Sequence, residues 1–295
     1  MEIHHRIIAA GQEKARILAA ELEKAGLAYR SRSNPTNSIE TSVAESHPCF
    51  PSLAQLVADY ELNDQPRPVF SDADRAAAEW FTIRAGEFQY PQPEDAYHEA
   101  TFDLSAYCWR CDIGAVQNRP FRLVGDFRQK LDFFGLHWVT DEIFLRQETR
   151  QLFEQEKLSG AGYLQPTLFM KGKPIDGLYQ LKLEAAAEPG FATADLFRVT
   201  CKPGNEEGPA IPGGKPYRFP VGYPYCGRVK YHLPERGWLC YARTSLAGKP
   251  DLFKSWEYFG AGDRAERLIL ASRKVYDLAR QKGFRGLVFT PIQLV

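Results

Sequence analysis

The sequence predicts a mixed α+β fold, with a mixed sheet, flanking helices and two related strand–helix–strand units in its C-terminal part. Three observations predict it. Residues 11–26 repeat apolar side chains at helical spacing, and residues 179–184 alternate apolar and polar side chains as a half-buried strand does. Residues 140–166 and 266–291 share one strand, helix and strand layout. With 44% hydrophobic and 13% aromatic residues, the chain can bury a sizeable core.

Three helices are expected in the N-terminal region. The first covers residues 11–26 and ends at Gly26, because glycine readily adopts the left-handed conformation that closes a helix. A second begins at Ser52, where a serine followed three residues later by Gln55 suits a capping box. A third opens at Ser71 and runs into three successive alanines.

A cluster of prolines and acidic residues at 91–95 predicts a domain boundary. It divides an N-terminal helical α/β region, residues 1–95, from a C-terminal α+β domain, residues 96–295. Within the second domain, residues 202–225 contain six prolines and five glycines, which block both helix and strand pairing. A long irregular segment is therefore expected there, either a functional loop or a solvated linker.

The two strand–helix–strand units, residues 140–166 and 266–291, are related by an offset of 126 residues (269 − 143). A unit of this kind can bury its apolar side only against other elements, so we expect the two copies to share one sheet or core. The residues identical at this offset are Ile143 and Ile269, Leu152 and Leu278, Gln155 and Gln281, and Gly160 and Gly286.

Composition excludes several classes of protein. Basic and acidic residues both number 37, so the chain lacks the cationic excess that favours nucleic acid or an anionic membrane. Its N-terminal apolar run is too short for a signal peptide, and no segment approaches about 18 consecutive apolar residues. Six irregularly spaced cysteines do not form a disulfide framework. We expect a cytoplasmic protein without membrane contact.

Cys108 and Cys111 form a C-x-x-C pair, a spacing that lets two thiolates hold one zinc ion from a tight turn. Cys226 precedes a glycine and is a third candidate ligand. Cys240 is the fourth residue of the predicted set, with Cys201 or a histidine as alternatives. The sequence alone favours buried, reduced cysteines and no cofactor, with a structural zinc ion as the alternative.

No catalytic motif is present. The six histidines never adopt the H-E-x-x-H spacing, and neither a phosphate-binding loop nor a nucleophile elbow occurs. The sequence therefore predicts a protein that is not an enzyme. Two alternatives stay open: an enzyme with an unrecognised carboxylate and histidine site, and a zinc-stabilised nucleic-acid-binding protein.

The segment 202–225 also carries alternating aromatic residues, among them Tyr217 and Phe219, and an acidic pair, Glu206 and Glu207. Exposed aromatic and acidic side chains together suit a surface that binds another protein. The alternative is that the rings simply anchor the loop to the core.

From about Tyr107 onward the chain resembles the double-CXXCG-motif proteins and related bacterial immunity proteins of polymorphic toxin systems. The resemblance lies in the cysteine pair at 108–111 and in the closing stretch 267–291, which ends Gly-Phe-Arg-Gly-Leu-Val-Phe-Thr-Pro. The chain departs from that pattern at two places. Asp112 follows the first cysteine pair where the pattern has glycine, and Tyr223 replaces the first cysteine of the second pair.

The resemblance implies a cytoplasmic protein that binds a cognate toxin and neutralises it by covering the toxin's active site. Its partner would be that toxin, and the oligomeric state is left open. The residues predicted to contact the toxin are Glu94, Asp95, Glu206, Glu207, Tyr217 and Phe219.

Overall fold

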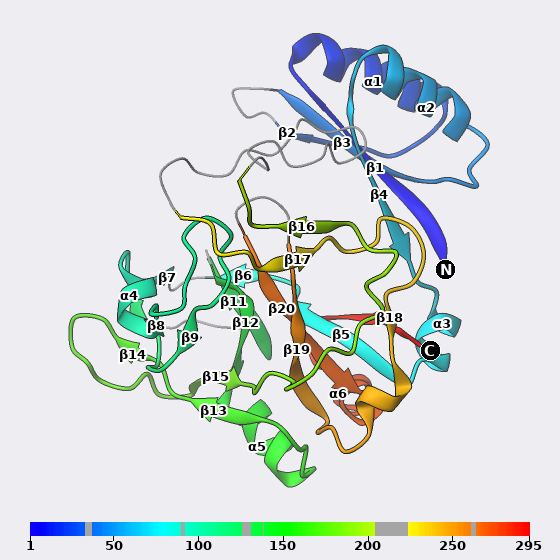
Figure 1. Ribbon diagram of the computed structural model, residues 1–295. Helices are drawn as coiled ribbons and strands as arrows, with labels where there is room; N and C mark the ends of the chain where they lie inside the picture. Colours follow the sequence, from blue (N-terminus) through cyan, green and yellow to red (C-terminus); the bar gives the residue numbers. More distant parts are fainter. Residues whose placement is uncertain (33–36, 90–91, 126–130, 138, 204–223, 261–263) are drawn as a thin grey trace. The chain divides into compact units, whose positions relative to one another are not determined.

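The computed structural model describes residues 1–295 apart from 33–36, 90–91, 126–130, 138, 204–223 and 261–263 (Figure 1). The described residues form two compact units. The first comprises residues 1–76 and 234–238, and the second comprises the others from residue 77 onward. The boundary expected at 91–95 lies inside the second unit, because strand β5 (Trp80–Ala85) pairs with strands from the C-terminal end of the chain.

The first unit is a four-stranded antiparallel sheet covered by two helices. The strand order is β2-β3-β1-β4. Along β1 the side chains of His5, Ile7 and Ala9 are buried, and they alternate with more exposed neighbours. Both α1 and α2 add leucines to the core that Ile7 and Ala9 begin, so they cover the same face. The elements are β1 (Glu2–Ala10), α1 (Gln12–Lys24), β2 (Arg30–Arg32), β3 (Ser38–Ala44), α2 (Phe50–Asp59), β4 (Asn63–Val69) and α3 (Asp72–Ala77).

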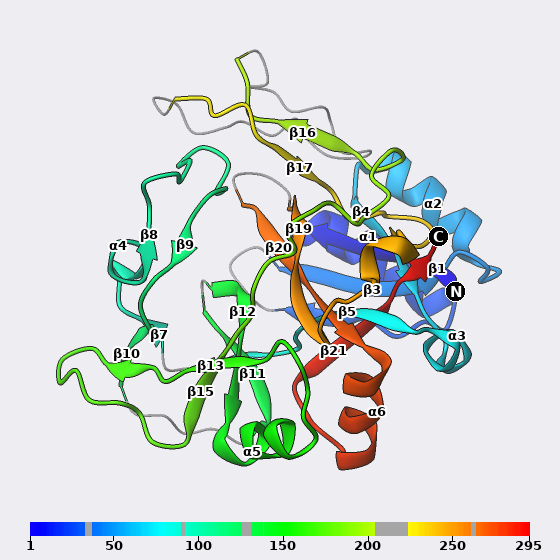
Figure 2. The same ribbon diagram turned by 60° about the horizontal axis from the view of Figure 1, so that its bottom comes forward.

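Two larger sheets make up most of the second unit (Figures 1 and 2). One has the order β13-β15-β12-β11-β6, and the other has the order β16-β17-β19-β20-β5-β21. Their strands are β6 (Phe88–Gln89), β11 (Phe133–Leu136), β12 (Val139–Arg146), β13 (Gly162–Leu164), β15 (Leu178–Lys182), β16 (Arg198–Thr200), β17 (Val229–Tyr231), β19 (Leu252–Phe259), β20 (Glu266–Ser272) and β21 (Leu287–Pro291).

The predicted repeat is confirmed. Strand β12, helix α5 (Gln147–Gln155) and β13 form the first unit, and β20, helix α6 (Arg273–Lys282) and β21 form the second. Each is preceded by a strand that forms a hairpin with its first strand, β11 with β12 and β19 with β20. The repeat therefore extends further toward the N-terminus than the identical residues indicated.

In each repeat, one more strand lies between the first and the last strand of the strand–helix–strand unit. Strand β15 lies between β12 and β13, and β5 lies between β20 and β21. Gln180 of β15 is opposite Phe144 and Leu164. Thr82 of β5 is opposite Leu270 and Thr290, which are the positions 126 residues further on. In the chain, β5 precedes the first hairpin and β15 the second, so each strand completes the sheet of the other repeat.

The two repeats also hold each other through matched backbone hydrogen bonds. The N–H of Leu252 donates to the carbonyl of Ser159 at 3.1 Å, and the N–H of Phe133 donates to the carbonyl of Arg285 at 3.1 Å. Ser159 and Arg285 are equivalent at the 126-residue offset. The turn after each helix is thus fastened to the hairpin of the other repeat.

One core serves both repeats. Phe153 of α5 and Val275 and Leu278 of α6 lie in the same buried cluster as Phe81 of β5 and Leu181 of β15. Figures 1 and 2 show α5 and α6 at the same end of the unit in both views. The expectation that two copies share one core is met, since both helices bury apolar side chains in this cluster.

Shorter elements complete the second unit. Residues 97–117 leave the main sheets and carry helix α4, the small β8–β9 hairpin and the Cys108 turn. Among the residues that the structure describes, none of the helices is both long and apolar enough to cross a bilayer. These elements are β7 (Gln92–Pro93), α4 (Tyr97–Thr101), β8 (Phe102–Asp103), β9 (Val116–Gln117), β10 (Arg122–Val124), β14 (Thr167–Leu168), β18 (Cys240–Tyr241), the 3-10 helix η1 (Arg243–Leu246) and β22 (Gln293–Leu294).

Candidate metal centre and the adjoining pocket

The C-x-x-C pair lies in a tight turn between β8 and β9. The N–H of Cys108 donates to the carbonyl of Ile113 at 2.9 Å, and the N–H of Asp112 donates to the carbonyl of Cys108 at 2.9 Å. Asp112 has φ of 64°, which is the left-handed conformation that glycine adopts most easily. The turn therefore keeps the shape of a Cys-x-x-Cys-Gly knuckle although aspartate occupies the last position.

Cys201 and Cys226 come from the two ends of the Pro- and Gly-rich segment. Cys201 directly follows β16, and its N–H donates to the carbonyl of Arg228 at 2.9 Å. The N–H of Gly227 donates back to the carbonyl of Cys201 at 2.9 Å. These bonds extend the β16–β17 pairing, so the segment 202–225 begins and ends at adjacent points.

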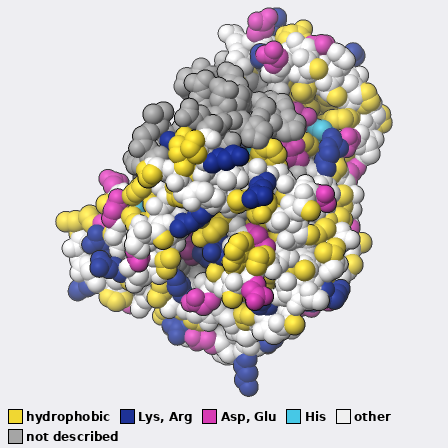
Figure 3. Space-filling view, viewed as in Figure 1, with side chains coloured by type: hydrophobic (Ala, Val, Ile, Leu, Met, Phe, Trp, Pro, Cys, Tyr) yellow, Lys and Arg dark blue, Asp and Glu magenta, His cyan; other side chains and the backbone are white. Residues whose placement is uncertain are grey.

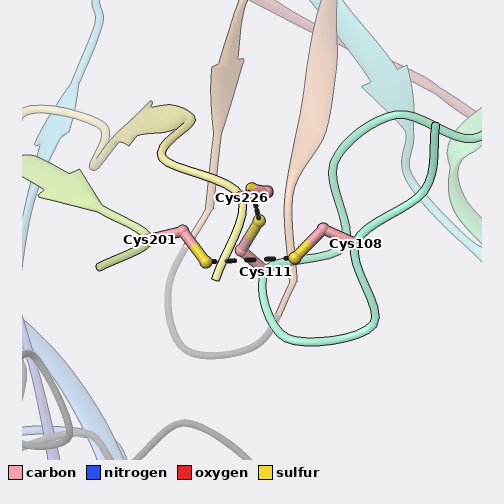
Figure 4. A group of neighbouring side chains, drawn as sticks. All are labelled: Cys108, Cys111, Cys201 and Cys226. Carbon is pink, nitrogen blue, oxygen red and sulfur yellow. Dashed lines mark hydrogen bonds between the residues drawn. The ribbon is translucent and has the colours of Figure 1, made fainter. Parts of the chain in front are cut away.

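The four thiols converge (Figure 4). The Sγ atoms of Cys108, Cys111, Cys201 and Cys226 all lie within 4.8 Å of one another. The Cys108–Cys201 distance is 3.9 Å and the Cys111–Cys226 distance is 3.5 Å. A disulfide requires about 2.05 Å. Four thiolates around one zinc ion, with Zn–S of about 2.3 Å, lie about 3.8 Å apart, so this arrangement fits a tetrahedral metal site.

Burial and hydrogen bonding act in opposite directions on these thiols. Burial works to raise the pKa of Cys108, but the N–H groups of Arg110 and Cys111 and the neighbouring thiols outweigh it, so its pKa is lowered. Burial raises the pKa of Cys111 and of Cys201. These surroundings therefore favour the thiolate of Cys108 and the protonated thiols of Cys111 and Cys201. A divalent cation among the four sulfurs would stabilise all of them as thiolates.

Two arginines stand next to the cluster. Arg110, between the two cysteines of the turn, is only 4% exposed, and its guanidinium lies 4.1 Å from the centre of the Tyr225 ring. The Nη1 of Arg228 donates to the carbonyls of Ala106 at 2.6 Å and Ile113 at 2.9 Å. Four thiolates around a divalent ion carry a net charge of about −2. Both guanidinium groups would help to balance that charge.

The fourth thiol of the cluster is that of Cys201, one of the alternatives considered for this place. Cys240, the residue placed in the predicted set, lies on β18, and its Sγ donates to Oε1 of Gln293 at 3.8 Å. No histidine belongs to this group of four ligands. Nothing in the local sequence marks Cys201 as a ligand, because its partners are 90 or more residues away or beyond a long irregular segment.

The residues predicted to contact a partner protein have different surroundings. Glu94 is 4% exposed and accepts hydrogen bonds from the guanidinium of Arg122. Asp95 beside it is exposed. The remaining four candidates, Glu206, Glu207, Tyr217 and Phe219, lie outside the described residues. Among the predicted contacts that the structure describes, Asp95 is therefore the acidic residue that a partner could reach.

A cavity of about 690 Å³ adjoins the cysteine turn within the second unit. Residues 97–117 form one wall, and strands β12, β15, β19 and β20 contribute the other. Aromatic rings dominate the first wall, where His98 lies 4.3 Å from Tyr97, centre to centre, and 6.1 Å from Trp109. Charged side chains dominate the second wall, among them Asp141 and Glu142.

The floor of this cavity is a buried ion pair. The Nζ of Lys254 lies 2.6 Å from Glu142 and 3.7 Å from Asp141. Gln180 donates to Glu142 at 2.9 Å and exchanges hydrogen bonds with Gln117. Burial lowers the pKa of Lys254, but the two carboxylates outweigh this effect and raise it, so lysine stays charged. The alternation of apolar and polar residues along 179–184 predicted that Gln180 faces solvent. The structure instead buries it fully.

Acidic and basic side chains are interspersed on the described part of the face in Figure 3. This agrees with the equal totals of 37 basic and 37 acidic residues.

The chain matches no protein-family model, and no curated protein matches its sequence. The resemblance to double-CXXCG-motif proteins therefore stays a prediction that rests on the motifs themselves.

Proposed function

We propose that this chain is a zinc-stabilised immunity protein, which binds a cognate bacterial toxin and neutralises it by covering the toxin's active site. The observation that carries the proposal is the convergence of the four thiols of Cys108, Cys111, Cys201 and Cys226 within 4.8 Å. Four sulfur donors in tetrahedral arrangement are the donor set that zinc prefers in structural sites.

A structural role for the metal follows from the number of ligands. A catalytic zinc site keeps one position open for water or substrate, whereas four protein sulfurs leave none. Three of the four cysteines are buried as well. The centre is thus suited to holding chain segments together, and the partner-binding surface must lie elsewhere.

We propose that this surface lies on a segment that the centre would hold. The metal would tie residues 108–111 to both ends of segment 202–225, which carries the predicted aromatic and acidic contacts. A binding loop with fixed ends loses less conformational entropy on association than a free one. We therefore place the toxin-binding surface on segment 202–225, with Asp95 as a further acidic contact.

Co-expression with the product of a neighbouring reading frame tests the proposal. The expected result is restored growth and a stable one-to-one complex that survives purification. Cys201→Ser should weaken the complex, whereas Cys240→Ser, the matched cysteine outside the cluster, should leave it intact. If no toxic neighbour exists, or if growth is restored without any complex, the immunity proposal is wrong.

A second candidate function is enzymatic, and the cavity beside the cysteine turn favours it. His98, Asp112 and Asp141 line this cavity and are of the types used for acid–base catalysis. Titration of a toxin with the protein separates the two candidates. A binding inhibitor reaches full neutralisation at one equivalent, whereas an enzyme acting on the toxin or its product does so far below one equivalent.

A further inference from the structure

We infer that the cavity next to the cysteine turn binds an organic cation, a ligand with a guanidinium or ammonium group seated between aromatic rings and carboxylates. The inference concerns binding at this cavity alone, and it does not depend on toxin neutralisation. It rests on three features: an aromatic wall, an excess of carboxylate charge facing that wall, and the engagement of the nearby cations with other groups.

The aromatic wall is a continuous cluster. Tyr97, Phe102, Tyr107 and Trp109 surround His98, with ring centres between 4.3 and 6.1 Å from the imidazole. Tyr107 and Trp109 pack edge to face at 4.8 Å. Trp109 is 44% exposed, so part of this large side chain reaches the surface. The faces of such rings attract cations electrostatically.

The carboxylates that face this wall are not balanced by positive charge. Lys254 is one cation shared between Glu142 and Asp141, and it lies much closer to Glu142. Asp112 accepts hydrogen bonds from the hydroxyl of Tyr107 and the N–H of Ala265, and both donors are neutral. Carboxylates outnumber basic side chains five to four among the described residues that line the cavity: Asp112, Asp141, Glu142, Glu184 and Glu266 against Lys182, Lys254, Arg264 and Arg267.

The same carboxylates also act on Tyr97. Burial, followed by the charges of Asp112 and Asp141, raises the pKa of Tyr97 to about 12. The Nδ1 atom of His98 is buried and has no hydrogen-bond partner among the described residues. The cavity thus combines negative potential with a free polar atom, as expected for a site that accepts a charged nitrogen.

Two of the other cations that line the cavity, Arg267 and Lys182, are held by groups of the chain. Nη1 of Arg267 donates to the carbonyls of Ser255 and Trp256, and its guanidinium lies 4.4 Å from the Tyr258 ring centre. Lys182 donates to the carbonyl of Gln117 at 3.4 Å. Arg264 is exposed, and its charge acts to lower the pKa of Tyr97. A ligand cation would therefore compete with Arg264 for the carboxylates of Asp112 and Asp141.

Calorimetric titration of the purified, zinc-loaded protein with three probes tests the inference. Agmatine represents a free small-molecule cation, and N-acetyl-arginine methylamide represents the same group on a polypeptide. N-acetyl-citrulline methylamide has nearly the same shape without the charge. We expect agmatine or the arginine derivative to bind and the citrulline derivative to bind at least about tenfold more weakly.

Two substitutions of Asp141 test whether the cation binds in this cavity. Asp141→Asn should weaken binding of the cation about tenfold, since a charged hydrogen-bond acceptor is lost. Asp141→Lys should abolish it, because a tethered ammonium would take the ligand's place. The side chain of Asp141 is 35% exposed, so both variants should fold. Asp176→Asn, an exposed aspartate outside the cavity, is the matched control and should bind as the parent does.

The outcomes separate the sources of the ligand. Binding of agmatine as tight as that of the arginine derivative assigns the site to a small molecule. Binding of the arginine derivative alone assigns it to a basic side chain of a partner protein. If neither probe binds, if citrulline binds equally well, or if Asp141→Lys binds as the parent does, the inference is wrong.

Discussion

At the scale of single residues, the centre depends on which cysteines meet in space. Cys201 and Cys240 are both partly or fully buried and both free of disulfides. Only Cys201 lies with Cys108, Cys111 and Cys226. The sequence predicted three of these four thiols, because the C-x-x-C spacing and the Cys-Gly pair are local signals. The fourth could not be chosen, because the β16–β17 pairing that places Cys201 is a long-range contact.

Substitution of the two cysteines tests this assignment. Cys201→Ser should reduce the zinc content well below that of the parent and lower the melting temperature by on the order of 10 °C, because a metal ligand is lost. Cys240→Ser should change neither. Metal analysis and calorimetry of both variants provide the measurement. Equal zinc content in the two variants would contradict the assignment of Cys201.

Asp251 links the two repeats and makes stability depend on pH. It accepts the N–H and hydroxyl of Ser159 at 2.9 and 2.8 Å and the hydroxyl of Ser272 at 2.7 Å. Asp132, which precedes the other hairpin, accepts the N–H of Arg285 in the matching position at 2.8 Å. Burial acts to raise the pKa of Asp251, but these hydrogen bonds outweigh it and lower the pKa.

Because the folded-state pKa of Asp251 is depressed, its ionised form stabilises the fold at pH values above the ordinary aspartate pKa. That contribution is lost as the pH falls from about 4 through the lower, folded-state value. We predict that Asp251→Asn is less stable than the parent at pH 7 and that the difference narrows by pH 3. Urea unfolding at both pH values measures this. A difference that stays constant would show that the charge of Asp251 contributes nothing.

At the scale of elements, the repeat ends both helices with the same backbone geometry. Lys157 after α5 has φ of 51°, and Gly283 after α6 has φ of 65°. Leu158 donates to the carbonyl of Phe153 at 3.1 Å, as Phe284 does to that of Ala279 at 3.0 Å. A left-handed conformation costs a lysine about 1–2 kcal/mol, whereas glycine adopts it freely.

Lys157→Gly should therefore stabilise the protein by about 0.5–1 kcal/mol, as strain relief exceeds the added entropy of the unfolded glycine. Gly283→Ala should destabilise it by about 1 kcal/mol for the converse reason. Chemical unfolding of both variants gives the two free energies. Destabilisation by Lys157→Gly would mean that contacts of the lysine side chain outweigh its backbone strain.

Three residues further on, each helix end carries a glycine that close packing requires. A Cβ on Gly160 would lie 2.0 Å from the carbonyl oxygen of Leu252, and one on Gly286 would lie 1.8 Å from that of Phe133. Both glycines also have positive φ. Gly160→Ala and Gly286→Ala should each cost more than about 2 kcal/mol, since backbone must move. Gly172→Ala, with positive φ but open space around it, is the control and should cost less.

Much of the element pattern could be predicted. Helices α1 and α3 follow from periodicity and the residues at their ends, and the strand–helix–strand repeat follows from four identities at one offset. The capping box expected at Ser52 and Gln55 is wrong, because α2 begins at Phe50 with Cys49 as its N-cap and no side chain caps it. The exchange of β5 and β15 could not be predicted, because it joins strands far apart in the chain. The buried Gln180 was also missed, since strand alternation takes no account of a polar side chain paired with Glu142.

At the scale of the whole molecule, the metal centre joins three segments of the second unit that lie far apart in the chain. Zinc would connect residues 108–111, Cys201 and Cys226, and so would close segment 202–225 at its base. Removal of the metal with a strong chelator should expose four additional thiols per chain to a thiol reagent. It should also speed proteolysis within 202–225. Unchanged thiol reactivity after chelation would contradict this account.

The proposed centre consists of one zinc ion bound by four sulfur atoms. X-ray absorption at the zinc edge, combined with metal analysis of protein purified without added metal, tests it most directly. The account predicts one zinc ion per chain, with four sulfur neighbours at about 2.3 Å. Protein without zinc, or zinc with nitrogen or oxygen neighbours in place of sulfur, would contradict it.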